Sequence, residues 1–267
     1  MSQKNKMSSI SRLHYFKLYF RSALFLGVLI FYIIKRIGGS RIVFSELAEH
    51  PALMVLICFI GVVVLVEMIF RFFPSSLESM GCQKQFAKNY LPREGAERKK
   101  GGALSVWMVA LVWILLNGAI GALYFLSVID DGILFLVSLF YAVCDMICIL
   151  FFCPFQTWFM KNKCCGSCRI YNWDYAMMFT PLVFIPHYFT WGLLGVALLL
   201  LFFWELAAHL HPERFDEQTN ECLSCAHCKE KLCHHKSQLR GFLRKNRERL
   251  RLKGNAVVEK VKHLTKK

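Results

Sequence analysis

Acidic residues are scarce in this chain of 267 residues, which has 18 Asp and Glu against 33 Lys and Arg and a net charge of +15. Familiar catalytic patterns are missing too. The chain has no Gly-x-Ser-x-Gly elbow, no phosphate-binding glycine loop and no His-Glu-x-x-His helix. A hydrolase or a transferase therefore has no positive support.

Charged residues make up only 19% of the chain, whereas 56% of it is hydrophobic and its mean hydropathy is +0.41. This composition excludes an ordinary soluble domain, and the 24 Phe, 9 Tyr and 6 Trp exclude an intrinsically disordered chain. An inert membrane anchor would not be so basic. The apolar and the basic residues must therefore occupy different segments.

Several apolar stretches are long enough to cross a bilayer, which requires about 20 residues of helix. Four of them lie at 19–34, 51–73, 103–129 and 132–152. A fifth apolar region, 176–210, is interrupted by Pro181 and Pro186, and proline breaks a helix interior. We expect a broken or re-entrant segment over 173–187 and a span over 189–210, the alternative being one long kinked helix.

The distribution of Lys and Arg predicts the orientation of these stretches. Basic segments lie before the first stretch, between the second and third, and after the fourth, whereas the turn between the third and fourth has Asp130 and Asp131 and no base. We therefore predict a multi-pass protein of the cell membrane with both termini cytoplasmic, so that region 176–210 enters and leaves on one side. The loop with Lys35 and Arg36 does not follow this rule.

Nearly all of the 12 cysteines fall at the predicted cytoplasmic face, Cys58 being the exception. Cys82 lies in a basic loop, and Cys144 and Cys148 share one helix face near the cytoplasmic end of the fourth stretch. The others form two groups of four. Because the cytosol keeps thiols reduced, metal ligands are expected rather than disulfides. The opposite orientation would permit disulfides but would place nearly all Lys and Arg outside.

The first group has the pattern Cys-x2-Cys-x2-Cys-x4-Cys and consists of Cys222, Cys225, Cys228 and Cys233. Such a compact run of thiolates can wrap one iron–sulfur cluster, and we expect the [4Fe–4S] type. The last gap is one residue longer than in bacterial ferredoxins, and no proline follows. Zinc is the rival metal, because neighbouring His227, His234 and His235 offer imidazoles for a tetrahedral site. Compactness favours the iron–sulfur cluster.

The second group lies in the loop 153–175 and consists of Cys153, Cys164, Cys165 and Cys168. Cys165 and Cys168 form a two-thiol hook, and Gly166 permits the tight turn between them. Basic neighbours favour the thiolate form. We expect a second metal site here, with a single structural zinc hook as the alternative. The two groups can also share one site.

The run Cys148-x4-Cys153-Pro154 at the end of an apolar stretch resembles membrane-bound polyferredoxins of the quinol-dehydrogenase type. In that family a Cys-x3-Cys-Pro element follows a transmembrane helix, so the spacing here is one residue longer. The family's paired ferredoxin motifs are missing from this chain. The resemblance implies iron–sulfur electron transfer at the membrane and extends only to Cys148, Cys153 and Pro154.

Ionisable residues within apolar stretches often mark functional paths. Glu67 lies four residues before Arg71, a spacing that predicts a helical ion pair. Asp145 adjoins a cysteine and can tune a nearby site or accept a proton, or can be an interfacial carboxylate. We expect Asp174 to cap the broken segment and Trp173 to anchor it at the interface.

Together these features predict an all-α, polytopic membrane protein with about five or six membrane segments, one of them broken by proline. Its predicted parts are a helical domain (1–210) with the Cys-rich loop, a Cys/His-rich metal-binding module (211–238) and a basic cytoplasmic tail (239–267).

The function that the sequence favours is iron–sulfur electron transfer at the cytoplasmic membrane face, as a redox component of an oxidoreductase complex with a partner protein. The alternative is a thiol-rich transporter or sensor of zinc, copper or heavier ions. Contact with membrane lipid is expected. Nucleic-acid binding is not, because no recognition module accompanies the basic tail.

Overall fold

A computed structural model describes residues 9–39, 44, 51–74, 80–93, 95, 103–160, 168–224 and 246. Every regular element within these ranges is helical, as predicted, and Pro92 and Asn220 form an isolated β-bridge. The elements are α1 (Ser9–Ile37), α3 (Pro51–Phe70), α4 (Met80–Gln85), η1 (Ala87–Asn89), α5 (Ala103–Phe125), α6 (Asp131–Leu150), the π-helical turn η2 (Phe155–Met160), η4 (Arg169–Trp173), α7 (Asp174–Phe179), η5 (Thr180–Phe184), α8 (Tyr188–Leu210), η6 (Pro212–Phe215) and η7 (Glu221–Leu223).

Four of the described helices are long and apolar enough to cross a membrane: Ser11–Ile37, Leu104–Phe125, Asp131–Leu150 and Tyr188–Leu210. Helix α3 is apolar over the shorter stretch Met54–Phe70. These lengths and compositions indicate a helical membrane protein.

Helix α1 is longer than the apolar stretch that predicted it. It begins at Ser9 and continues through Lys17 and Arg21. Arg21 lies within the apolar stretch and is only 9% exposed. Partners on other helices allow the charge to remain inside the bundle.

The proline-broken segment has the predicted form. Helix α7 passes into the 3₁₀ turn η5, which has Pro181 in its first turn, and α8 begins after His187. His187 starts this helix by accepting a hydrogen bond on Nδ1 from the backbone N–H of Phe189, at 3.2 Å. The chain therefore contains two helices here rather than one kinked helix.

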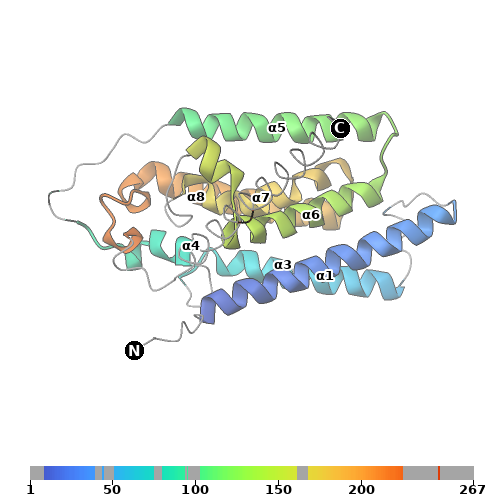
Figure 1. The fold of residues 1–267 in the computed structure, drawn as a ribbon, viewed down its shortest axis with the longest axis horizontal. Coiled ribbons are helices and arrows are strands. Elements are labelled where there is room, and N and C mark those ends of the chain that lie inside the picture. Colours follow the sequence, from blue (N-terminus) through green and yellow to red (C-terminus); the bar gives the residue numbers. More distant parts are fainter. Residues whose placement is uncertain are drawn as a thin grey trace, which may run out of the picture.

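The segment from α7 to α8 turns back within the bundle. The Phe184 ring lies 5.8 Å from that of Phe125 at the end of α5, whereas Glu205 near the end of α8 pairs with Arg169 at the opposite end of the bundle. Figure 1 shows α5 along one side of the bundle and α1 along the other, with α6, α7 and α8 between them.

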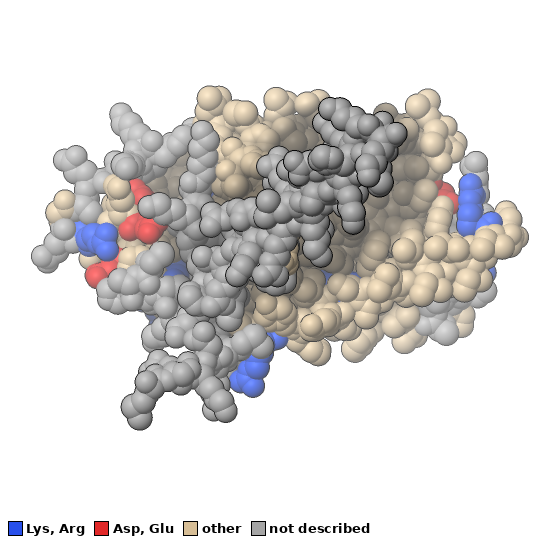
Figure 2. All heavy atoms as spheres, in the orientation of Figure 1, with Lys and Arg blue, Asp and Glu red and all other residues tan. Residues whose placement is uncertain are grey.

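The core lies where α7 and α8 meet α3 and α6, and Tyr175, Met68, Leu134 and Leu200 are nearly inaccessible there. Apolar side chains also cover much of the outside, because the bilayer takes the place of water. Figure 2 shows the described Lys, Arg, Asp and Glu mainly toward the two ends of the visible face.

Two glycines of α5 provide a test of this packing. A Cβ atom on Gly121 would lie 2.3 Å from the Phe184 ring, whereas one on Gly118 would meet nothing within 4 Å. We expect Gly121→Ala to destabilise the fold by about 1–3 kcal/mol through overpacking. Gly118→Ala should be neutral or stabilising by about 0.5–1 kcal/mol, because alanine favours helix. Thermal unfolding in detergent measures both, and equal effects would contradict the packing of η5 on α5.

Candidate functional site

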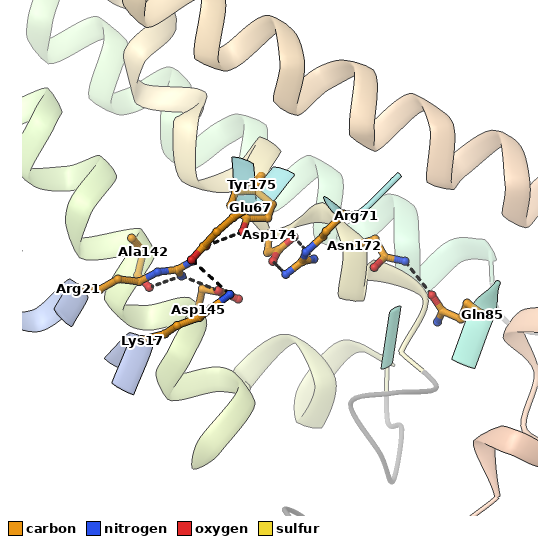
Figure 3. A network of polar contacts seen from close by, with 10 residues as sticks. All are labelled: Lys17, Arg21, Glu67, Arg71, Gln85, Ala142, Asp145, Asn172, Asp174 and Tyr175. Atoms are coloured by element: carbon orange, nitrogen blue, oxygen red, sulfur yellow. Dashed lines mark hydrogen bonds and ion pairs between the residues drawn. The ribbon is translucent and has the colours of Figure 1, made fainter. Parts of the chain in front are cut away.

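The guanidinium of Arg21 lies at the centre of a buried polar network (Figure 3). Its Nη1 donates to Asp145 Oδ2 at 2.9 Å and to the backbone oxygen of Ala142 at 3.1 Å, both on α6. Its Nη2 donates to Glu67 Oε2 on α3 at 3.3 Å. Arg21 thereby ties α1 to two other helices.

Two further side chains, from other helices, contact the Glu67 carboxylate. Lys17 Nζ lies 3.3 Å from its Oε1, and the Tyr175 hydroxyl donates to its Oε2 at 2.9 Å. Lys17 and Arg21 lie four residues apart on α1 and so face the same way. The carboxylate of Glu67 thus joins α1, α3 and α7.

Arg71 and Asp174 form a two-pronged ion pair beside this group. Nη1 donates to Oδ1 at 2.9 Å and Nη2 lies 2.7 Å from Oδ2, with side chains only 5% and 7% exposed. The Arg71 guanidinium also lies over the Tyr175 ring, 4.8 Å from its centroid. The sequence spacing suggested a Glu67–Arg71 pair, but both residues pair with charges on other elements. The expectation that Asp174 caps this segment is wrong: Trp173 is the N-cap of α7, and Asp174, its first residue, binds the Arg71 guanidinium.

These ion pairs contain equal numbers of positive and negative side chains, namely Lys17, Arg21, Arg71, Glu67, Asp145 and Asp174. Burial removes each group from water at a cost of several kcal/mol per ion, and only good pairing geometry offsets this cost. The α3 and α6 carboxylates lie near the ends of their helices, so the network sits toward one end of the bundle.

A cavity of about 130 Å³ adjoins the network and is lined by the thiol-bearing residues Cys144, Cys148, Cys153 and Cys168. Asp145 and Asp174 form part of the same wall. The cavity therefore places four cysteines from the end of α6 and the start of η4 next to two buried carboxylates.

Two of the predicted site residues lie here. Cys153 follows α6, and its sulfur accepts a hydrogen bond from the backbone N–H of Gln156 at 3.4 Å. Cys168 is 4% exposed and packs with Val109 and Ile170. The structure thus brings Cys153 and Cys168 to one cavity.

The position of η4, which follows Cys168, is fixed by Glu205 of α8. Glu205 Oε2 accepts from Arg169 at 2.5 Å, and its Oε1 accepts from Trp173 Nε1 at 2.7 Å. Trp173 was expected as an interfacial anchor, and the structure shows that its indole N–H holds η4 against α8.

Cys222 is the described member of the other predicted group. Its thiol donates to the backbone oxygen of Asn89 at 2.9 Å. Asn220, fully buried, fixes this segment by donating to the backbone oxygens of Lys84 and Arg214 at 3.0 and 2.8 Å. Helix α4 contacts both η7, which contains Cys222, and η4, which follows Cys168.

The other predicted ligands lie outside the described residues, namely Cys164, Cys165, Cys225, Cys228 and Cys233. Within the ranges that the structure describes, no group of three or more His, Cys, Asp or Glu side chains is arranged to hold a metal ion. The seven cysteines described there, including Cys58 and Cys82, are thiols.

Sequence reasoning did not identify Lys17, Arg21 and Tyr175 as members of a site. The signal for the first two was available, because charges four residues apart in an apolar helix share one face and need partners. Tyr175 gave no such signal. Comparisons with protein families, curated proteins and solved structures found no match for this chain.

The Arg71–Asp174 pair can be tested against an exposed pair in the same chain. Replacing Asp174 with Asn leaves a buried guanidinium without its counter-charge, and we expect a loss of about 3–5 kcal/mol in unfolding free energy. Glu213, 3.3 Å from His211, is 39% exposed, so Glu213→Gln should cost about 0–1 kcal/mol. Unfolding in detergent measures both. A loss in Asp174→Asn as small as that in Glu213→Gln would contradict a buried pair.

Proposed function

We propose that the protein is an integral membrane iron–sulfur protein that transfers electrons at the cytoplasmic membrane face. Cys222, Cys225, Cys228 and Cys233 hold one cluster in this proposal. Cys153, Cys164, Cys165 and Cys168 hold a second centre. The protein acts as a redox component of a larger complex and requires a partner protein as electron donor or acceptor.

The observation that carries the proposal is the meeting of Cys153 and Cys168 at one cavity, although a whole loop separates them in sequence. Thiolates are the donors that iron–sulfur clusters use, and ligands usually converge from separate parts of a loop. The remaining thiols of this group, Cys164 and Cys165, belong to the same loop by sequence.

The proposed orientation of the protein in the membrane rests on charge. The loops at the cavity end of the bundle are basic in sequence, and basic loops remain cytoplasmic. Lys161 and Lys163 closely precede Cys164 and Cys165 in sequence, so basic residues accompany these two thiols. Such charge favours thiolate over thiol and stabilises an anionic cluster.

In this proposal the protein positions the ligating sulfurs and sets the environment around them. Glu205 holds η4 through Arg169 and Trp173, and Asn220 holds the segment before Cys222. Rigid support of this kind keeps ligating sulfurs in place, and the hydrogen bonds and burial around them tune the reduction potential.

Metal and sulfide analysis of anaerobically purified protein tests the proposal, together with visible absorption and paramagnetic resonance. We expect iron and acid-labile sulfide in equal amounts and a resonance signal on reduction. If two centres are present, Cys168→Ser and Cys225→Ser should each lower the iron content by about half.

Cys58→Ser is the matched control, because Cys58 lies on α3 and is not among the residues that line the thiol cavity. Its iron content should equal that of the unmodified chain. A colourless protein with stoichiometric zinc would contradict the electron-transfer proposal.

Transport or sensing of a soft metal ion is the second candidate. One observation favours it: the cavity wall includes Cys144 and Cys148 on α6 together with Asp145, so potential ligands continue into the bundle. Soft thiolates select zinc, monovalent copper or heavier ions. In this case the purified chain carries zinc or copper in place of iron, and Cys148→Ser alters metal uptake.

A further inference from the structure

A second and larger cavity, of about 420 Å³, lies between α1, α3 and α6 on the other side of the charge network. It takes no part in the proposed thiol chemistry. Its lining is almost entirely apolar over most of its length, with contributions from α8 as well. A long apolar ligand therefore matches it better than a polar metabolite.

The cavity opens toward the surroundings of the bundle between α1 and α3. Phe16 and Phe20 on α1 and Phe59 on α3 line it, and they are 66%, 44% and 63% exposed. Helix α1 packs chiefly on α6, which leaves the space beside α3 accessible. In a membrane protein this opening faces lipid rather than water.

The two ends of the cavity differ in charge. Lys17, Arg21 and Glu67 line one end, and Tyr32 and Asp131 line the other. From Lys17 to Tyr32 the helix rises by about 22 Å, at 1.5 Å per residue. One leaflet is about half of the 30 Å hydrocarbon core, so an acyl chain with its headgroup at Lys17 fits within this length.

Lys17 is suited to contact a headgroup. Its side chain is 20% exposed, and its ammonium has three N–H donors, of which Glu67 Oε1 engages one at 3.3 Å. Glu67 also accepts from Arg21 and Tyr175, so its charge is already shared among three donors. In sequence no Asp or Glu precedes Glu46, so the whole of α1 lacks acidic residues. Helix α1 therefore contributes only positive charge to this end of the cavity, and the two Lys17 N–H donors that Glu67 does not engage point to an anionic headgroup.

We propose that the cavity between α1 and α3 binds an anionic phospholipid, with its phosphate beside Lys17 and one acyl chain extending along α1 toward Tyr32. The chain is held by burial of its methylene groups against the apolar lining. Charge complementarity at Lys17 selects the headgroup.

The test uses the full chain, delipidated in detergent and then exposed to phosphatidylglycerol or phosphatidylcholine of equal chain length. Native mass spectrometry counts the lipids that remain bound. We expect retention of phosphatidylglycerol in preference to phosphatidylcholine. Leu24 lines the cavity and Leu26 is 53% exposed on the outer face of α1. Leu24→Trp should weaken retention of both lipids by about tenfold, and Leu26→Trp should leave it unchanged.

Lys17→Gln separates the contribution of the headgroup to binding from that of the acyl chain. It should reduce the preference for phosphatidylglycerol while phosphatidylcholine binds as before, and Lys17→Arg should restore the preference. If Leu24→Trp fails to fold, Val28→Phe fills the same cavity with a smaller change. Equal retention in the Leu24 and Leu26 variants would overturn the proposal. A lipid-free chain that dimerises through this face, and loses the dimer in Leu24→Trp, would also overturn it.

Discussion

The burial of Arg21 is the constraint on which the arrangement of this protein depends. A guanidinium does not lose its proton, so a chain that places it inside an apolar bundle must bring carboxylates to it. Asp145 and Glu67 supply them from two different helices, and Lys17 and Tyr175 complete the coordination of Glu67. Together with the packing of α1 on α6, these contacts determine where along the bundle α1 docks.

The same network explains why two cavities of different chemistry lie close together. Asp145 and Asp174 form part of the wall around the four thiols, whereas Lys17, Arg21 and Glu67 close the charged end of the apolar cavity. A network with balanced charge separates them without leaving a net charge inside the bundle. Any change of charge at the thiols would therefore act next to residues that also hold α1.

Much of the fold could be predicted from composition and spacing. Apolar stretches located the long helices, and Pro181 and Pro186 located the break before α8, because a proline cannot continue a helix interior. The turns of α1 before residue 19 could not be predicted, since they include Lys17, whose partner Glu67 lies on another helix. The Arg71–Asp174 pair was also missed. Spacing along one helix favoured Glu67 as the partner of Arg71, whereas packing brought Asp174 of α7 to the Arg71 guanidinium. The sequence placed Cys153 in one group with Cys168, but only packing reveals that Cys144 and Cys148 line the same cavity.

A double-mutant cycle on Arg21 and Asp145 tests most directly whether this network determines the fold. The free energy of unfolding is measured in detergent for Arg21→Met, for Asp145→Asn and for both together. Arg21→Met leaves the Asp145 carboxylate without its partner and should cost about 3–5 kcal/mol. Asp145→Asn should cost less, because Glu67 remains as a counter-charge for Arg21. The double variant should cost clearly less than the sum, because neither charge remains. Additive losses would show that the two side chains act independently and would contradict the account.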